Sequence, residues 1–207
     1  MIISKIFFGF DVRTKGSGNM GSTNVFRVLG TKWGIVVQAI DIFKAWFPIV
    51  FFAHNYDMFV GQELAQDTLV LYQLAIGFTA MFGHIFSVFV KFKGGKGVNT
   101  AMGLILAVAP AETGVALIFF FSALLSTGYI SLASIAGSCS MSLIVLARMK
   151  LLDYNAPGYD YILYFFILLA VVVLVTHKAN IKRLIGGTEN RFDKLKIINF
   201  SKKNERK

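Results

Sequence analysis

Long apolar runs separated by short charged segments constrain the fold of this chain more than any other feature. Trp33–Ala53 and Thr68–Val90 each reach the length of about 20 residues that a helix needs to cross a bilayer. Apolar residues make up 56% of the 207 residues, which is more apolar surface than a soluble domain of this size can bury. The sequence therefore predicts an integral membrane protein with an all-α fold.

Three further apolar stretches complete the predicted polytopic helix bundle. Val98–Ser126 is too long for one span and contains a proline, an acid and a glycine, so we expect two helices joined by a tight turn at Ala109–Thr113. Ser131–Ala147 and Tyr161–Thr176 are shorter and are separated by a segment rich in turn residues. The sequence therefore predicts six spans.

Basic side chains gather on one side of this bundle. If the spans alternate in direction, only Arg148 and Lys150 of the 21 lysines and arginines fall on the opposite side, and only Lys44 lies inside a span. The opposite side receives the acids Asp57, Glu63, Asp67, Glu112, Asp153 and Asp160. Because Lys and Arg are enriched in cytoplasmic loops, the basic side is predicted to be cytoplasmic. The same bias accounts for the net charge of +10, so we expect no nucleic-acid partner.

Two glycine-rich segments lie on this cytoplasmic side. "GSGNMGSTNVFR" runs from Gly16 to Arg27, before the first span, and "KFKGGKGVNT" runs from Lys91 to Thr100, after the second. Glycine backbone can curve its N–H groups around an anion, and Arg27 and Lys96 add positive charge close by. Each segment alone is equally explained by a tight turn whose cations face lipid headgroups. Two such segments facing each other predict a phosphate site.

A third polar cluster, "THKANIKRL", follows the last span. His177 and Asn180 are three residues apart, so on a helix continuing from the membrane they share one face, where both could hydrogen-bond a phosphate or carbonyl oxygen. The alternative is a basic segment that reaches the headgroups after the span. Ser131, in "GYISLASI", lies at the same face of the membrane, although serines in membrane helices more often serve packing.

Three ionisable residues fall inside the predicted spans and need partners there. Asp41 and Lys44 are three residues apart, which predicts a structural ion pair on one helix. His84 lies near the cytoplasmic end of its span, close to the lysine-containing segment. We expect an interhelical hydrogen bond for His84, with contact to substrate as the alternative.

Four segments, taken in order, resemble a known family. "GSGNMGSTNVFRVLG", "GHIFSVFVKFKGGKGVNT", "SLASI" and "HKANIKRLIGGTEN" together are similar to the bacterial acyl-phosphate:glycerol-3-phosphate acyltransferases, the PlsY family, from about Asp11 to Phe192. The resemblance implies a multi-pass enzyme of the cytoplasmic (inner) membrane with its active site on the cytoplasmic side. It also implies a membrane-embedded acyltransferase domain over residues 1–192. Residues 193–207 are rich in lysine and arginine, so we expect a basic cytoplasmic tail there.

The resemblance further implies an activity and a set of site residues. The expected reaction moves a fatty acyl group from acyl phosphate to the 1-hydroxyl of sn-glycerol 3-phosphate, which gives 1-acylglycerol 3-phosphate (lysophosphatidic acid) in the first step of phospholipid synthesis. The catalytic positions carried over are His177, Asn180, Lys96 and Ser17. The substrate-binding positions are Arg27, Asn19, Gly94, Gly95, Gly97 and Ser131. We expect acyl phosphate, glycerol 3-phosphate and membrane lipid as partners, and no metal or cofactor.

The expected chemistry needs no covalent intermediate. Acyl phosphate is a mixed anhydride with a good leaving group, so orienting the hydroxyl beside its carbonyl and stabilising developing charge can suffice. Either His177 or a substrate phosphate could take the proton. Two other functions stay open from the residues alone: a membrane transporter of an organic phosphate, and a non-catalytic lipid-binding or scaffold protein.

The chain departs from the family pattern at several places. Members of the family have seven spans, the first of which precedes the first glycine-rich segment, whereas only 15 residues precede Gly16 here. We therefore expect a truncated first helix and a chain started late, at an internal methionine. Gly128, Ser87 and Asn99 stand where Arg, Pro and Ala, respectively, are frequent.

Overall fold

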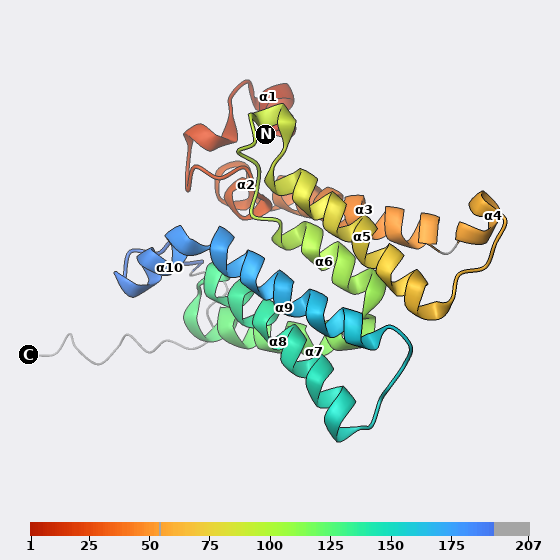
Figure 1. The fold of residues 1–207 in the computed structure, drawn as a ribbon. Coiled ribbons are helices and arrows are strands. Elements are labelled where there is room, and N and C mark those ends of the chain that lie inside the picture. The colour runs from red at the N-terminus through yellow and green to blue at the C-terminus, as the bar shows by residue number, and fades with distance from the viewer. Residues whose placement is uncertain (54, 193–207) are drawn as a thin grey trace, which may run out of the picture. The chain divides into compact units, whose positions relative to one another are not determined.

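The computed structural model describes residues 1–53 and 55–192, and every regular element in these ranges is helical (Figure 1). The elements are α1 (Ile2–Phe8), η1 (Val12–Thr14), α2 (Ser22–Leu29), α3 (Thr31–Pro48), η2 (Ile49–Ala53), α4 (Tyr56–Val60), α5 (Gln66–Ile85), η3 (Val88–Val90), α6 (Val98–Val108), α7 (Pro110–Thr127), α8 (Ile130–Leu151), α9 (Tyr159–Thr176) and α10 (Lys178–Ile185). The all-α prediction is confirmed for the described residues. The predicted basic tail, residues 193–207, lies outside them.

Five stretches are long and apolar enough to cross a membrane. They are Thr31–Ala53, Gln66–Val90, Pro110–Thr127, Ile130–Leu151 and Tyr159–Thr176. These agree closely with five of the predicted spans. The predicted count of six is not confirmed, because α6 has only 11 residues and is about 16 Å long, against a hydrocarbon core of about 30 Å.

The predicted division of Val98–Ser126 into two helices is confirmed, but the break is shorter than expected. It is confined to Ala109, whose backbone leaves the helical region at φ −141° and ψ 64°. Pro110 begins α7, where a proline costs no hydrogen bond because the first amides of a helix have no intrahelical acceptor. Glu112 lies in the first turn of α7, near the positive end of the helix dipole.

The chain divides into two compact units, which are described separately. The first comprises Met1–Pro110 and Asn155–Phe165, and the second comprises Ala111–Tyr154 and the described part of Phe166–Lys207. The first unit thus carries both glycine-rich segments. The second carries the cluster that begins at Thr176.

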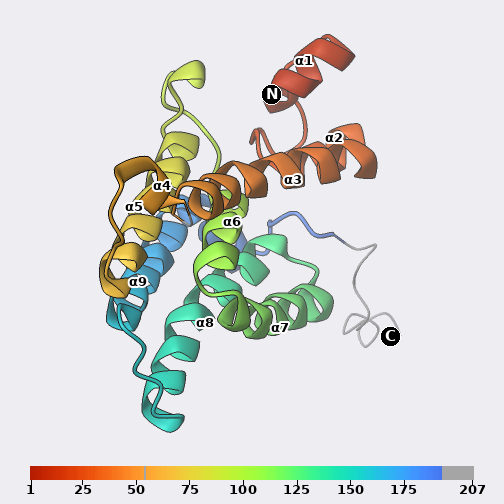
Figure 2. The ribbon, with the colours of Figure 1, turned by 90° about the vertical axis from the view of Figure 1, so that its right-hand side faces the viewer.

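Close helix packing defines the core of the first unit. Helix α6 packs against both α3 and α5, as Figures 1 and 2 show from two directions. A β-carbon at Gly103 of α6 would overlap the Ile42 carbonyl oxygen of α3, and one at Gly77 of α5 would overlap the fully buried Leu104. Glycines at these contacts let the helix backbones approach, as is common between membrane helices. The packing fixes where the amino end of α6 lies relative to α2 and α3.

A buried core and an ion pair between α7 and α8 stabilise the second unit. Met141 and Val145 of α8 are fully buried, as is Phe166 of α9. Glu112 of α7 is buried and pairs with Arg148 of α8. The loop predicted to follow Ala147 begins later, because α8 continues to Leu151 and includes Arg148.

Candidate functional site

Asn24 of α2 organises the first glycine-rich segment. Its Nδ2 donates to the carbonyl oxygens of Val12, Lys15 and Asn19, at 3.0, 3.1 and 2.8 Å, while its Oδ1 accepts from the Ser17 amide at 2.7 Å. The Asn24 side chain is buried. One amide group therefore fixes the backbone around two predicted site residues, Ser17 and Asn19, and the sequence analysis did not identify it.

Glycines and a carboxylate complete this segment. Gly16 and Gly18 have φ of 64° and 73°, in the left-handed region that favours glycine. The side-chain oxygen of Asn19 accepts from the Gly21 amide at 2.8 Å, just before α2 begins. Upstream, the Arg13 guanidinium and amide donate to the Asp11 carboxylate and hold the pKa of Asp11 well below its usual range.

The second glycine-rich segment folds back onto the end of α5. The Gly94 amide donates to the Ile85 carbonyl oxygen at 3.0 Å, and the Gly95 amide donates to the His84 carbonyl oxygen at 3.3 Å. The glycines of this segment predict N–H groups that surround an anion. These two N–H groups instead attach the segment to α5, which places Lys96 directly after an anchored Gly-Gly pair.

The two glycine-rich segments meet where their helices begin. Gly97, with φ 81°, caps the amino end of α6, and Gly21 caps that of α2. Asn99, in the first turn of α6, donates from Nδ2 to the hydroxyl oxygen of Ser22, the first residue of α2, at 2.7 Å. The prediction that the segments face each other is confirmed. The amino ends of helices offer backbone N–H donors and a partial positive charge, so two converging ends favour an anion.

Arg27 lies on α2, and Lys96 lies in the loop that leads into α6. Arg27 lies in the last turn of α2, and Lys96 precedes the glycine that caps α6; both are half-buried. Six of the seven residues predicted for this unit lie in the two loops that lead into α2 and α6, and Arg27 lies in the last turn of α2. The seven are Ser17, Asn19, Arg27, Gly94, Gly95, Lys96 and Gly97.

His177 and Asn180 lie at a helix break in the second unit. The sequence analysis expected one helix to continue from the membrane, but α9 ends at Thr176 and α10 starts at Lys178, with His177 between them at φ −99° and ψ 7°. Both side chains are buried, at 2% and 5% exposure. His177 Nδ1 lies 2.8 Å from the Val173 carbonyl oxygen. A carbonyl only accepts, so Nδ1 carries the proton and the lone pair of neutral His177 is on Nε2.

Glu189 holds three side chains of the second unit together and was missed by the sequence analysis. Its Oε1 accepts from Asn180 Nδ2 at 2.6 Å and from the Ser131 hydroxyl at 3.0 Å, and its Oε2 accepts from Arg183 Nε at 2.6 Å. Burial raises the pKa of Glu189, but the hydrogen bonds from Asn180, Arg183 and Ser131 outweigh it, so the pKa lies below the usual value of 4.5. The signal in the sequence was that Glu189 is the only acidic residue between Thr176 and Arg191, a segment rich in lysine and arginine.

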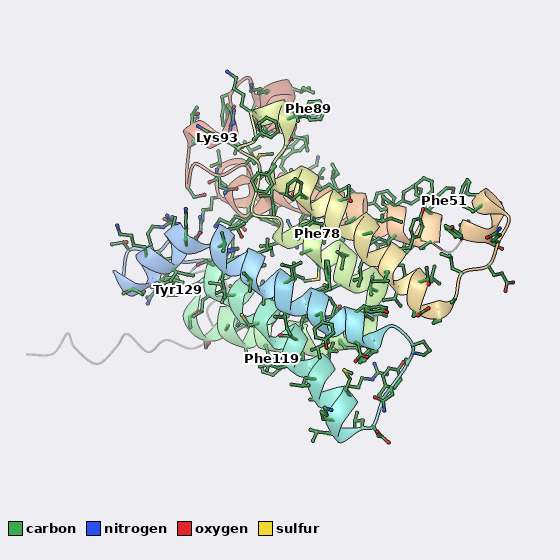
Figure 3. The ribbon with its side chains drawn as sticks, viewed as in Figure 1. Phe51, Phe78, Phe89, Lys93, Phe119 and Tyr129 are labelled. Carbon is green, nitrogen blue, oxygen red and sulfur yellow. The ribbon has the colours of Figure 1, made fainter. Side chains whose placement is uncertain are left out.

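The residues after α10 return to the α7–α8 turn. The Phe192 amide donates to the Gly128 carbonyl oxygen at 2.8 Å, and Arg191 Nε donates to the Tyr129 hydroxyl at 2.9 Å. Tyr129 is labelled in Figure 3. Gly128 has φ 76°, in the left-handed region that favours glycine. These contacts bring Ser131 to Glu189.

The ionisable residues of the spans are paired as expected. Lys44 Nζ donates to Asp41 Oδ1 at 2.6 Å on α3, which confirms the predicted ion pair. Lys44 also contacts Nδ1 of His84 on α5, which confirms the interhelical hydrogen bond predicted for His84.

Several known proteins are similar to this chain over most of its length. A family model described as glycerol-3-phosphate acyltransferase matches residues 1–187. The glycerol-3-phosphate acyltransferase of Chlorobaculum tepidum is 37% identical over 222 residues, which cover 99% of this chain and 91% of the relative. That of Chlorobaculum parvum is 38% identical, over 92% of this chain and 88% of the relative.

Two solved structures are also similar. A crystal structure of PlsY (YgiH), an integral membrane glycerol 3-phosphate acyltransferase in its glycerol 3-phosphate form, aligns with a TM-score of 0.76 and 32% identity, over 92% of this chain and 86% of that chain. The lysophosphatidic acid form of PlsY aligns with a TM-score of 0.73. The chain described here is therefore a multi-pass membrane protein that belongs to the glycerol-3-phosphate acyltransferase family.

Proposed function

We propose that this acyltransferase uses acyl phosphate as donor and acylates the 1-hydroxyl of sn-glycerol 3-phosphate, releasing 1-acylglycerol 3-phosphate and inorganic phosphate. One observation supports this most directly. The amino ends of α2 and α6 meet at the Asn99–Ser22 hydrogen bond; Arg27 lies on α2, and Lys96 lies in the loop that leads into α6. Both substrates carry a phosphate, and helix amino ends with nearby cations are suited to bind one.

The proposed acceptor site is the segment around Lys96. Lys96 and the first amides of α6 bind the phosphate of glycerol 3-phosphate, while Gly94, Gly95 and Gly97 give the loop its path. Arg27 and Asn19 bind substrate phosphate from the first glycine-rich segment, and Ser17 acts in catalysis beside them. The solved glycerol 3-phosphate and lysophosphatidic acid forms of PlsY support glycerol 3-phosphate as the acceptor and lysophosphatidic acid as the product.

The proposed step is a direct acyl transfer. The 1-hydroxyl oxygen attacks the carbonyl carbon of acyl phosphate, the bond from that carbon to the phosphate oxygen breaks, and phosphate leaves with its electron pair. Lys96 and Arg27 stabilise the charge that develops. The proton passes to Nε2 of His177 or to a substrate phosphate; the Val173 contact leaves the lone pair on Nε2. Asn180 and Ser131 are substrate contacts whose side chains Glu189 orients.

We further propose that this chemistry takes place at the cytoplasmic face of the inner membrane. The turn that contains η3 supports this orientation, because Phe89 is 87% exposed and Phe92 64% exposed, next to the exposed Lys91 and Lys93. Figure 3 labels Phe89 and Lys93 on this turn. Aromatic rings and cations together are typical of a segment at the lipid headgroups, so membrane lipid is a proposed partner.

The deciding experiment is transfer of acyl from palmitoyl phosphate to radiolabelled glycerol 3-phosphate by the purified protein. Palmitoyl-CoA is the control donor. Lys96→Ala is expected to remove the product, whereas Lys93→Ala, on the same loop but exposed, is expected to keep it. Equal product from palmitoyl-CoA would refute the donor, and full activity in Lys96→Ala would refute the site.

A further inference from the structure

Three ionisable side chains form a cluster behind the lysine-containing loop. Lys44 Nζ lies 2.6 Å from Asp41 Oδ1 and contacts His84 Nδ1, and His84 Nδ1 lies 3.6 Å from Asp41 Oδ1. The side chains are 13% (Asp41), 32% (Lys44) and 10% (His84) exposed. Charges inside a membrane span are costly unless they are paired, and such groups commonly serve a function. The proposed chemistry does not use any of the three.

The contacts define the tautomer of His84. An ammonium group has no lone pair, so Lys44 donates and His84 Nδ1 accepts. The Nε2 of His84 therefore carries the proton. That edge of the ring faces the loop, because a β-carbon at Gly95 would overlap His84 Nε2. The imidazole thus lies between Lys44 on α3 and the backbone of Gly95.

His84 supports the loop with its backbone as well. Its carbonyl oxygen accepts from the Gly95 amide at 3.3 Å, and the neighbouring Ile85 carbonyl accepts from Gly94 at 3.0 Å. A β-carbon at Gly94 would overlap the His84 carbonyl oxygen, so only glycine permits this approach. Lys96 follows directly, so its position depends on how firmly His84 is held.

We propose that Asp41, Lys44 and His84 are positioning residues for the acyl-transfer reaction. Asp41 holds Lys44, Lys44 holds the His84 ring, and His84 holds the Gly94–Gly95 backbone, which places Lys96 at the start of α6. This inference rests on the proposed function of Lys96. A loop displaced by a fraction of an ångström weakens phosphate binding without removing any group that touches substrate.

The first test separates the two Michaelis constants. His84→Ala is expected to raise KM for glycerol 3-phosphate about tenfold and to leave KM for palmitoyl phosphate within about twofold of the wild-type value. Lys44→Met, which keeps the length but removes the charge, is expected to act in the same direction, and the conservative Lys44→Arg is expected to restore most of the binding. A rise of both constants by the same factor would overturn the proposal.

A matched control excludes a general loss of stability. Glu112→Gln breaks another ion pair, which belongs to the second unit, whereas both glycine-rich segments belong to the first. It is expected to lower the Tm at least as much as His84→Ala while leaving KM for glycerol 3-phosphate unchanged. If His84→Ala lowers the Tm and leaves that KM unchanged, the cluster only stabilises the helices and the proposal fails.

A second measurement tests how firmly the Gly94–Gly95 backbone is held, independently of enzyme activity. Amide hydrogen exchange at Gly94 and Gly95 is expected to be about tenfold faster in His84→Ala than in the wild type, and unchanged in Glu112→Gln. Unchanged exchange in His84→Ala would overturn the positioning role. A wild type that lacks transfer altogether would refute the proposed function instead, so the two failures are distinguishable.

Discussion

Asn99 Nδ2 lies 2.7 Å from Ser22 Oγ, and this hydrogen bond joins residues 77 positions apart at the starts of α6 and α2. The bond connects the two glycine-rich segments directly, because Asn99 and Ser22 each lie in the first turn of the helix that follows one of them. A neutral hydrogen bond of this kind contributes about 1 kcal/mol.

Loss of the Asn99–Ser22 hydrogen bond is predicted to lower catalytic efficiency modestly, and by the same factor whichever of the two residues is changed. Asn99→Ala is expected to lower kcat/KM for glycerol 3-phosphate about fivefold, because the two helix starts lose their direct connection. Ser22→Ala should do the same, and the double variant should cost no more than either single change. Additive losses would show that the two residues act separately.

Substitution of Asn24 is predicted to reduce both stability and activity more strongly. Asn24→Ala removes four hydrogen bonds to the backbone around Ser17 and leaves buried carbonyl groups unsatisfied, so we expect a loss of about 3 kcal/mol in stability and near-complete loss of transfer. Asn24→Asp keeps the acceptor but not the three donor contacts and should fail similarly. Thr23→Ala, beside it on α2, is the control. Denaturation in detergent and the transfer assay measure both effects.

Alanine substitutions at Gly95 and Gly83 are predicted to differ sharply in their effect on activity. Gly95→Ala places a methyl group onto the His84 ring, so activity should fall severely. Gly83→Ala, on α5, meets open space and removes backbone freedom from a helix, so it should keep activity and add up to about 1 kcal/mol of stability. Transfer rates and Tm values of the two variants provide the comparison.

Glu189 predicts a pH-dependent stability. Its pKa in the folded protein lies below the usual 4.5, so the folded state favours the carboxylate, and this stabilisation is present above about pH 4.5 and is lost as the pH falls through the folded-state pKa. Glu189→Gln removes this contribution. The Tm difference between wild type and Glu189→Gln should therefore be constant near neutral pH and shrink below about pH 4.5. A difference that grows on acidification would contradict the assignment.

The Glu112–Arg148 pair predicts an effect on stability alone. Glu112→Gln leaves Arg148 without its partner, which for a buried pair costs about 3 kcal/mol, reduced here because the Arg148 side chain is 32% exposed. The double change Glu112→Leu/Arg148→Met should recover much of the loss, since apolar groups need no partner. Unfolding in detergent measures the stabilities, and unchanged KM values confirm that the site is unaffected.

The sequence by itself determined the features that depend on neighbours along the chain. Apolar length predicted Thr68–Val90, which the structure extends to Gln66–Val90, and four other spans, because the thickness of the bilayer fixes how long a helix must be. The spacing of Asp41 and Lys44 predicted their ion pair because residues three apart share a helix face. Four ordered segments were specific enough to indicate the family that the comparisons confirm.

Only the tertiary structure decided how distant residues are used. The sequence cannot show that the Gly94 and Gly95 amides bond to α5, that Asn99 reaches Ser22, or that Glu189 accepts from Asn180 and Ser131. These contacts join elements that the hydrophobic periodicity of the sequence treats separately. In the first unit their geometry follows from how closely α3, α5 and α6 pack, and in the second unit it follows from the return of the chain after α10 to the start of α8. The physical reason is that a hydrogen bond requires donor and acceptor within about 3 Å, a distance that helix packing sets and that spacing along the chain does not.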